Sequence, residues 1–323
     1  MSEETLQITQ DPPTLSHVIG QRAVIEQARI AMDAAFEDGL PFPSTLMTGP
    51  PGLGKSMIAQ VIAREMASGY TEILGQTLIV PADLNALLLG AAEKSVIFID
   101  EADELNVYLM TTLYRAVEDR RVYLESSSPG KVPQAIPLPP FTIILASNHE
   151  HSIVPQLRDR LRLNLRFEYY TEAELADVLR QRSRSLGWSV DEQVVGLIAQ
   201  RGRGTPRIAL RLLESARRVC RSLGETTILS EHLAKACSLE GVDTRGLERQ
   251  ELMLLKMLHE ARKPLRLNVI AARLGLPTRT IANVFEPYLL RLGLIQRCAE
   301  GRAITHEGIE YLAASARKVL EAS

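Results

Sequence analysis

The stretch GPPGLGKS at Gly49–Ser56 constrains the fold of this chain more than any other feature. It fits the pattern G-x-x-x-x-G-K-[ST] and lies between the apolar run STLMTG and the helix-forming run KSMIAQVIAREMA. A strand, a glycine-rich turn and a helix in this order form a loop whose backbone N–H groups can bind phosphate. The alternative is an ordinary glycine-rich turn, which the flanking strand and helix disfavour. We therefore expect an α/β domain with a parallel sheet and a phosphate site at this loop.

The residue types in and after this loop predict their roles. Lys55 can reach the outer phosphates as a point charge, and the Ser56 hydroxyl can ligate Mg²⁺. The buried-strand pattern SVIFID ends on Asp100 and is followed by Glu101. We expect Asp100 to hold Mg²⁺ through water and Glu101 to orient an attacking water. A merely solvated strand end is the alternative, but adjacent acids after an apolar run are costly without such a use.

A second buried-strand pattern, FTIILAS, ends just before Asn148. This side chain is a candidate for contact with the terminal phosphate or for positioning water, and a simple cap on the strand end is the alternative. Strands and helices alternate up to this point, which indicates an α/β layer. After residue 170 the strand signal fades, and Thr171 with Glu174 predicts a capping box at a helix start.

We expect three domains, at 1–170, 171–245 and 246–323. Their balances of Lys and Arg against Asp and Glu are 13 to 21, 12 to 10 and 12 to 8, so the charge runs from −8 through +2 to +4. The basic C-terminal part could bind a polyanion, although a solvated surface explains the charge equally simply.

The rest of the composition excludes several protein classes. The chain has no run of ~18 apolar residues that would predict a membrane span. Its acidic, polar start lacks the features of a signal peptide. The three cysteines are an odd number without metal spacing, which favours reduced thiols and a cytoplasmic location.

The order of phosphate loop, acidic strand and Asn-ended strand resembles that of AAA+ ATPases. This resemblance implies that Arg160, in the segment VPQLRDR, reaches the ATP of a neighbouring subunit, so that the active site is complete only in a ring. The alternative is that Arg160 and Arg158 pair with local acids such as Asp159.

The segment RGRGTPRIALRLL at 201–213 resembles the second-sensor motif of the same superfamily. Arg207 would contact the terminal phosphate, and Pro206 would begin the helix at a position that tolerates proline. The remaining arginines of this segment are expected to be solvated or to lie at an interface: Arg201, Arg203 and Arg211.

A longer set of motifs resembles the RuvB family of ATPases that drive branch migration of Holliday junctions. The set comprises GPPGLGKS, IFIDE, LYRAVED, LPPFT, LRDR, RGTPRIA, EPYLL and GR, in family order over roughly residues 10–305. The resemblance implies an AAA+ P-loop ATPase domain with a parallel sheet, a helical lid domain and a C-terminal winged-helix domain. It also implies ATP and Mg²⁺ as cofactors and a ring, expected to be a hexamer. The expected nucleotide-binding residues are Ile19, Gly49, Pro50, Pro51, Gly52, Gly54, Lys55, Ser56, Met57, Tyr170, Pro206 and Arg207. The resemblance also places the stretch 118–120 near the site.

The third domain would then bind four-way or duplex DNA. The segment RLNVIAARLGLPTRTIANVFEPYLLRLG predicts two helices at helix-turn-helix spacing, and a strand, turn and strand at 294–305 would form the wing. By the resemblance, Arg279, Arg297 and Arg302 contact the DNA backbone, which would neutralise phosphates without reading sequence. A protein-binding winged helix with ordinary surface arginines is the alternative.

The chain departs from the family pattern at four places. Asp11-Pro12 stands where the family has RP, and ASNH, with Asn148 and His149, stands where it has ATTR. ADEL follows the strand in place of IHRL. In segment 122–138, where the family contacts a RuvA-like junction-binding partner through a β-hairpin, the expectation is a ladder disrupted by Pro129, Pro133 and Pro137.

Two functions follow from these patterns, together with a weaker third. The first is an ATP-dependent motor that acts at Holliday junctions in recombination and repair. The second is an AAA+ remodeller or adaptor whose winged helix binds protein. The third is an ATP-binding switch without useful turnover, which the presence of Lys55, Asp100, Glu101 and Arg160 disfavours.

Overall fold

The computed structural model of the chain describes residues 12–124 and 134–321. The chain separates into two compact units. The first comprises Met1–Gly187 and Gly204–Arg207, and the second comprises Trp188–Arg203 and Ile208–Ser323. The four residues Gly204–Arg207 therefore belong to the first unit although both of their neighbours in sequence belong to the second.

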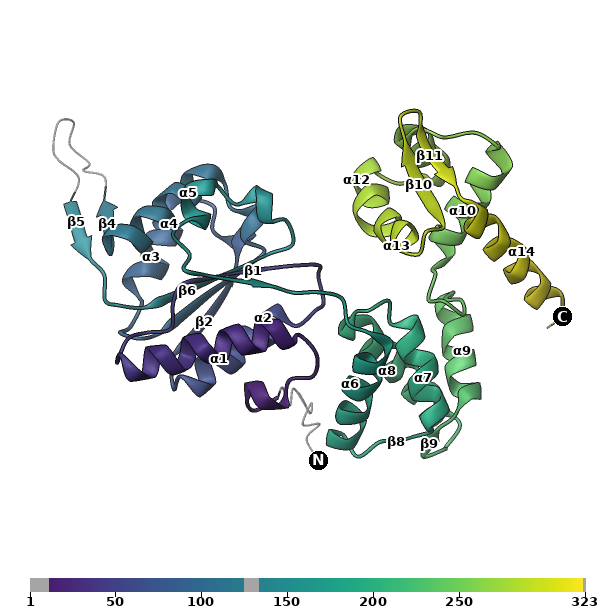
Figure 1. The fold of residues 1–323 in the computed structure, drawn as a ribbon, viewed down its shortest axis with the longest axis horizontal. Coiled ribbons are helices and arrows are strands. Elements are labelled where there is room, and N and C mark those ends of the chain that lie inside the picture. Colours follow the sequence, from purple (N-terminus) through teal and green to yellow (C-terminus); the bar gives the residue numbers. More distant parts are fainter. Residues whose placement is uncertain (1–11, 125–133, 322–323) are drawn as a thin grey trace. The chain divides into compact units, whose positions relative to one another are not determined.

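A five-stranded parallel sheet organises the first unit (Figure 1), in the order β2-β3-β6-β1-β7. The strands are β1 (Thr45–Thr48), β2 (Tyr70–Leu74), β3 (Val96–Asp100), β6 (Thr142–Ser147) and β7 (Leu163–Arg166). The sequence patterns predicted β1, β3 and β6 correctly, because these strands are buried on both faces and read as apolar runs. They missed β2 and β7, which lie at the two edges and carry polar residues.

Helices cover both faces of this sheet. One face packs Leu46, Ile97, Ile99, Ile143 and Leu145 against helices that lie over it. These helices are α3 (Pro81–Leu89), α4 (Val107–Asp119) and α5 (Pro155–Arg158). The alternate strand residues point to the other face. There α1 (Arg22–Glu37) and α2 (Lys55–Glu65) pack. Because helices cover the side chains on both faces, the centre of the sheet is buried. The carboxyl ends of the strands remain available to form the site.

Helix α6 (Glu172–Ser185) follows the sheet and begins with the expected capping box. The Thr171 hydroxyl accepts from the Glu174 backbone N–H, and the Glu174 carboxylate accepts from the Thr171 N–H. The next helices are α7 (Glu192–Arg201), α8 (Pro206–Ser222) and α9 (Ser230–Glu240), with short parallel strands β8 (Ser189–Val190) and β9 (Thr227–Ile228). They belong to the second unit except for the first two residues of α8. Pro206 is the first residue of α8, as expected.

The C-terminal part has its own apolar core, which includes Leu254, Leu258, Ile270, Leu289 and Tyr311. Its helices are α10 (Arg249–Ala261), α11 (Leu267–Leu274), α12 (Thr278–Thr280), a π-helical turn (Ile281–Phe285), α13 (Glu286–Arg291) and α14 (His306–Glu321). Strands β10 (Ile295–Cys298) and β11 (Gly301–Ile304) pair antiparallel and form the predicted wing. The sequence patterns did not predict α14. None of the described helices is long and apolar enough to cross a bilayer.

A hairpin base projects from the first unit, contrary to the expected disruption. Strand β4 (Arg121–Leu124) pairs antiparallel with β5 (Gln134–Pro137) over four residues each. Pro137 is tolerated because it is the last residue of its strand, opposite Arg121. The expectation of a disrupted ladder is therefore wrong for these strands, whereas Pro129 and Pro133, like Asp11, lie outside the described residues.

Candidate functional site

The ammonium group of Lys55 is held inside the phosphate loop. Its Nζ donates hydrogen bonds to the carbonyl oxygens of Gly49, at 2.6 Å, and Pro50, at 3.0 Å, and to Asn148 Oδ1, at 2.9 Å. Burial lowers the pKa of Lys55 to about 8, against the opposing charges of Asp100 and Asp103. The structure thus brings together the predicted lysine and the predicted Asn148, from the first turn of α2 and the end of β6.

The hydroxyl of Ser56 donates to Asp100 Oδ2 at 3.1 Å. The two residues come from the start of α2 and the end of β3, so the fold places a hydroxyl and a carboxylate side by side next to the phosphate loop. Oxygen ligands of this kind are those that Mg²⁺ prefers, and Mg²⁺ commonly uses few protein ligands together with phosphates and water. The donor set therefore fits the predicted cation.

Glu101 leaves the strand in a constrained conformation. Its φ is 52°, in the left-handed region, and its backbone N–H donates to Asp100 Oδ1 at 2.9 Å. Gly75, just after β2, packs directly on this turn, because a Cβ at Gly75 would overlap the Glu101 carbonyl oxygen. The sequence gives no indication of Gly75, since a lone glycine after an exposed edge strand forms no motif.

Asp103 is a second site residue that the sequence motifs did not predict. Its Oδ1 is buried and has no hydrogen-bond partner among the described residues, and its charge acts on Lys55. The signal was available, because the acidic pair of the strand end is followed at 103 by a third acid in DEAD. This acid stands in the segment where the chain departs from the family pattern.

The second-sensor segment lies against the phosphate loop within the first unit. The Arg207 backbone N–H donates to the Gly52 carbonyl oxygen at 3.4 Å. A Cβ at Gly52 would lie 2.9 Å from Arg207 Cβ and from Thr205 Cγ2, and Gly52 has a φ of +79°. Glycine is therefore required here both by the backbone conformation and by the close approach of the segment that contains Pro206.

Tyr170 links this segment to the loop. Its hydroxyl donates to the Leu53 carbonyl oxygen at 3.4 Å, and its backbone N–H donates to the Gly204 carbonyl oxygen at 2.9 Å. Burial raises the pKa of Tyr170 to about 12, so the ring stays neutral. A Cβ at Gly20 would meet the Tyr170 ring at 2.6 Å, so the backbone at Gly20 packs directly on this ring. Gly20 follows the half-buried Ile19 in the chain.

The remaining members of the predicted nucleotide set also lie at the loop. Gly54, with a φ of +97°, directly precedes α2, and the Met57 methyl group would be 3.1 Å from a Cβ at that glycine. Pro51 is exposed on the outside of the loop. The structure therefore brings the predicted set around one loop, while the contacts of each residue with a nucleotide stay a prediction.

Arg160 takes no part in the hydrogen bonds of the phosphate loop described above, and its side chain packs against α4. Its Nε pairs with Glu118 Oε2 at 2.9 Å, and its guanidinium lies 6.0 Å from the centre of the Tyr114 ring. About half of the Arg160 side chain is exposed. The local partner is thus Glu118, in the stretch 118–120, rather than Asp159, and the arginine keeps an accessible face.

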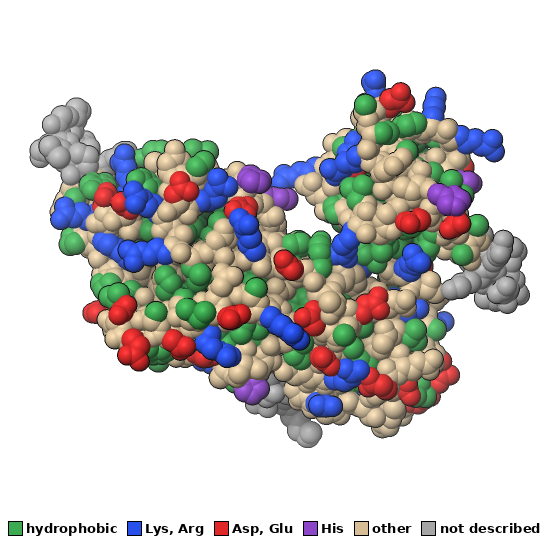
Figure 2. Space-filling view, viewed as in Figure 1, with side chains coloured by type: hydrophobic (Ala, Val, Ile, Leu, Met, Phe, Trp, Pro, Cys, Tyr) green, Lys and Arg blue, Asp and Glu red, His purple; other side chains and the backbone are tan. Residues whose placement is uncertain are grey.

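The predicted DNA-contacting arginines occupy the wing and the helix before it. Arg279 is exposed on α12. Arg297 on β10 and Arg302 on β11 both donate through Nε to Glu286 Oε1, each at 2.9 Å, and Arg302 Nη2 donates to Glu286 Oε2 at 3.1 Å. Glu286 is buried, so it neutralises part of the charge of this pair. Figure 2 shows several other Lys and Arg side chains on the same part of the chain.

Of the two environments expected for Arg203, solvated or at an interface, the solvated one is wrong. Its side chain is only 11% exposed and pairs with the fully buried carboxylate of Glu251, with Nη2 at 2.6 Å from Oε2. No local sequence pattern predicts this pair, because its two members lie 48 positions apart. The expectation does hold for Arg211, whose side chain is 54% exposed and whose distance to Glu248 Oε1 is 3.7 Å.

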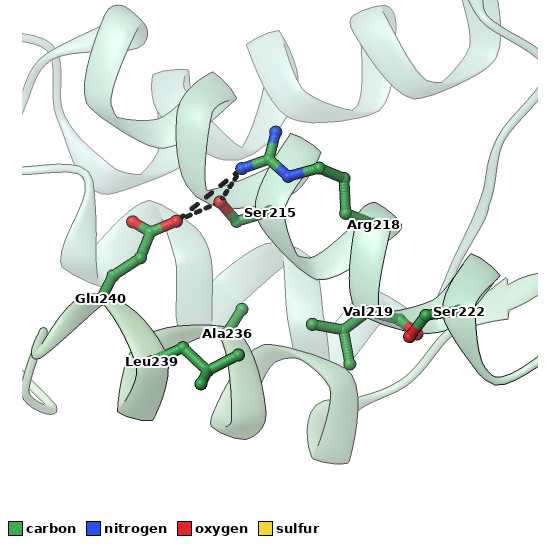
Figure 3. A pocket seen from close by; sticks show the side chains of 7 residues that line it. All are labelled: Ser215, Arg218, Val219, Ser222, Ala236, Leu239 and Glu240. Atoms are coloured by element: carbon green, nitrogen blue, oxygen red, sulfur yellow. Dashed lines mark hydrogen bonds and ion pairs between the residues drawn. The ribbon is translucent and has the colours of Figure 1, made fainter.

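The second unit contains a groove of about 370 Å³ between α8 and α9 (Figure 3). Ser215, Arg218 and Glu240 meet at one end of it, where Arg218 Nη2 donates to Ser215 Oγ at 2.6 Å. Leu239 and Val219 line the rest. Its polar groups are paired with one another, and the predicted site residues lie elsewhere.

Comparison with known families covers most of the chain. The model described as "Holliday junction DNA helicase RuvB P-loop domain" matches residues 10–167. The model described as "RuvB AAA lid domain" matches residues 170–243, and that described as "RuvB C-terminal winged helix domain" matches residues 244–313.

Individual relatives agree with these matches. The chain is 34% identical over 311 residues to the Holliday junction branch migration complex subunit RuvB of Ehrlichia ruminantium, covering 96% of this chain and 94% of the relative. It is 36% identical over 318 residues to the protein of that name from Kosmotoga olearia, covering 97% and 92%. The structure of the Thermotoga maritima RuvB Holliday junction branch migration motor superposes with a TM-score of 0.82 at 30% identity, covering 94% of this chain and 98% of the other.

Proposed function

This chain belongs to the RuvB family, and we propose that it is an ATP-driven motor that moves the branch point of Holliday junctions in recombination and repair. The observation that carries this proposal is the intact phosphate site. Lys55, Ser56, Asp100 and Asn148 meet there through direct hydrogen bonds. The same chain carries a winged helix with arginines on its wing. One chain thus supplies both an ATPase site and a basic element suited to DNA.

The residues at the loop suit hydrolysis of ATP. The Lys55 ammonium would exchange its carbonyl partners for phosphate oxygens, and backbone N–H groups of the loop would complete the cradle. Ser56 and Asp100 would hold Mg²⁺, which supplies charge neutralisation on the phosphates when it is bound. Glu101 would orient the attacking water, and Asn148 would position the terminal phosphate or that water. Arg207 would contact the same phosphate from the start of α8.

Completion of the site by a neighbouring subunit is a further part of the proposal. Arg160 keeps an exposed face, and its partner Glu118 is itself about one-third exposed, so the pair can open without a large loss of buried contacts. An arginine supplied across an interface would stabilise charge on the phosphoryl group as it transfers. This role requires a homo-oligomeric ring, for which we propose a hexamer.

The DNA-binding part would hold duplex arms through phosphates. Arg279, Arg297 and Arg302 offer donors of the kind that contacts the backbone, and such contacts carry no sequence information. That property suits a motor that has to move along any sequence.

We also propose that the hairpin formed by β4 and β5 contacts a RuvA-like junction-binding protein through segment 122–138. The chain would act in the cytoplasm, with domains at 1–170, 171–245 and 246–323.

Binding and turnover measurements with four-way DNA test this function. ATPase rates with and without a four-way junction should differ, and junction affinity should fall steeply as salt rises from 50 to about 200 mM. A chain that turns over ATP at one rate in both conditions and does not bind the junction would contradict the proposal. The alternative of a remodeller that binds protein through its winged helix would then take its place.

A further inference from the structure

Arg203, two residues after the end of α7, contacts the winged-helix part of the second unit. Its Nη1 donates to Glu251 Oε1 at 2.9 Å and its Nη2 to Glu251 Oε2 at 2.6 Å, which is a two-pronged ion pair. Its Nε donates to the Gly246 carbonyl oxygen at 2.7 Å. The guanidinium also lies 4.5 Å from the centre of the Tyr288 ring of α13. One side chain therefore contacts the linker before α10, α10 itself and α13.

The backbone of Arg203 is held from the same side. Arg291, at the end of α13, donates through Nη2 to the Arg203 carbonyl oxygen, and Arg291 also lies over the Tyr288 ring at 5.0 Å. Arg203 has a φ of 55°, in the left-handed region that a non-glycine residue adopts only under constraint. These contacts fix both the side chain and the main chain at this point.

The ion pair between Arg203 and Glu251 is buried, which makes it costly to separate. The Glu251 side chain is fully buried and also accepts a hydrogen bond from the Glu248 backbone N–H at 2.8 Å. Burial raises the pKa of Glu251, while Arg203 and the Glu248 N–H oppose that change by stabilising the carboxylate. A buried ion pair of this geometry resists separation, because either partner alone would be left as an uncompensated buried charge. The planar guanidinium matches the carboxylate in a way that lysine cannot.

The next residue in the chain begins the segment that contacts the nucleotide loop. Gly204 accepts from the Tyr170 backbone N–H, and Arg207 donates through its backbone to Gly52. Gly204–Arg207 belongs to the first unit, whereas Arg203 belongs to the second. The chain crosses between the two units at three places, and one of them is the peptide bond between Arg203 and Gly204.

We propose that Arg203 is a positioning residue that couples the nucleotide state of the phosphate loop to the winged helix. This inference rests on the proposed function, since it needs a chain that binds both ATP and DNA. A change at the phosphate loop that moves Gly204–Arg207 would move Arg203, and the Glu251 and Gly246 contacts would carry α10 and α13 with it. The contacts of Arg203 given above are all with protein groups, so its effect on either ligand would be indirect.

The test measures coupling rather than activity. The affinity of the full-length protein for a four-way junction is measured with a slowly hydrolysed ATP analogue and with ADP, and the ratio of the two dissociation constants reports the coupling. Coupling between two sites typically changes affinity by about 5- to 150-fold. We expect a ratio of at least about fivefold in the parent protein and a ratio within about twofold of one after Arg203→Met.

A second variant separates coupling from folding. Arg203→Met leaves Glu251 buried and unpaired, so it is compared with Arg203→Met/Glu251→Leu, in which no buried charge is left without a partner. The double variant should be folded, should bind junction DNA in the ADP state within about twofold of the parent, and should still lack the nucleotide-dependent ratio. The matched control is Arg211→Ala, which removes an exposed and long ion pair from α8 to Glu248. It should retain the parent ratio.

Each outcome decides the proposal. A double variant that keeps the parent ratio overturns it, and so does one whose affinities fall equally in both nucleotide states, because that is the result of a purely structural role. A parent protein that binds the junction with the same affinity in both states also overturns it. Failure of the parent to bind the junction at all is a separate result, which removes the proposed function.

Discussion

Glu286 accepts hydrogen bonds at 2.9 Å from the Nε atoms of both Arg297 and Arg302. Burial alone would raise the pKa of Glu286, but the hydrogen bonds and charges of Arg302 and Arg297 outweigh it and leave the pKa lowered. The carboxylate therefore stays ionised and holds the two arginines across the wing. Two of the three arginines proposed to contact DNA are thus positioned by one buried side chain, and their combined charge with Glu286 is +1.

Removal of the three arginines should flatten the salt dependence of DNA binding. Replacing Arg297 and Arg302 alone would leave Glu286 buried and unpaired, so the variant is Glu286→Gln/Arg279→Gln/Arg297→Gln/Arg302→Gln. Its control is Glu286→Gln, which keeps the arginines. Relative to that control, the slope of log affinity against log salt for duplex DNA should flatten by roughly 3, because each phosphate contact contributes about 0.9. An unchanged slope would mean that the winged helix does not hold DNA.

Gly75→Ala should lower the turnover of ATP without weakening nucleotide binding. The new Cβ would overlap the Glu101 carbonyl oxygen, so the turn that positions the Glu101 side chain must shift. A displacement of this kind should cost about 10²-fold in kcat. Gly69→Ala is the control, because its Cβ would lie 3.7 Å from Ser95 Cβ, an ordinary contact. Equal turnover in the two variants would remove Glu101 from the role of orienting water.

Arg160 should act on the nucleotide of a neighbouring subunit. Subunits with Arg160→Ala and subunits with Lys55→Ala should each be inactive alone. In mixed rings, some interfaces pair an intact phosphate loop with an intact Arg160, so ATPase activity should partly return. Co-assembly is checked by pull-down of one tagged variant with the other. Mixed rings that assemble but stay inactive would show that the site is not shared between subunits.

Nucleotide affinity should fall above about pH 8. Burial lowers the pKa of Lys55 to about 8 in the free protein, and bound phosphates would raise it again. Below pH 8 the lysine is charged in both states and affinity is constant. Above it, binding must recover a proton, so affinity should fall by up to about tenfold per pH unit. Isothermal titration from pH 6.5 to 9.5 measures this, and Lys55→Arg, whose guanidinium stays charged, should bind with a flat profile. A flat parent profile would contradict the role of Lys55.

The amino-acid sequence predicted those parts of the site that lie within short contiguous motifs. The phosphate loop, the ends of β3 and β6 and the wing each have a recognisable local pattern, and the fold brings the first three together although Lys55 and Asn148 lie 93 positions apart. The same patterns gave no indication of Gly75, whose position depends on how edge strand β2 packs. The acid at Asp103 follows the acidic pair in the sequence, but its place beside Lys55 depends on the turn after β3. The roles of the predicted residues toward ATP and DNA stay predictions.

The ion pair between Arg203 and Glu251 could not be predicted from the sequence, for a physical reason. Arg203 and Glu251 bind each other across the junction between the helical part and the winged helix, and neither carries a local signal of burial. Charged residues are mostly exposed, so the expectation that Arg203 is solvated or lies at an interface followed from the ordinary behaviour of arginine. At the hairpin, a local signal was present but misleading. Three prolines in one segment predicted a disrupted ladder, although Pro137 occupies a strand end that accepts proline.

Conversion of a mobile four-way junction into two duplexes is the direct assay of whether this chain is a branch-migration motor. A labelled junction with homologous arms is incubated with the full-length protein, with and without a RuvA-like junction-binding protein, and the products are separated on a native gel. We expect duplex products that require ATP and Mg²⁺ and disappear with Glu101→Gln, which should still bind nucleotide and junction. A protein that hydrolyses ATP and binds the junction but leaves it unconverted under every one of these conditions would contradict the claim that this chain is a branch-migration motor.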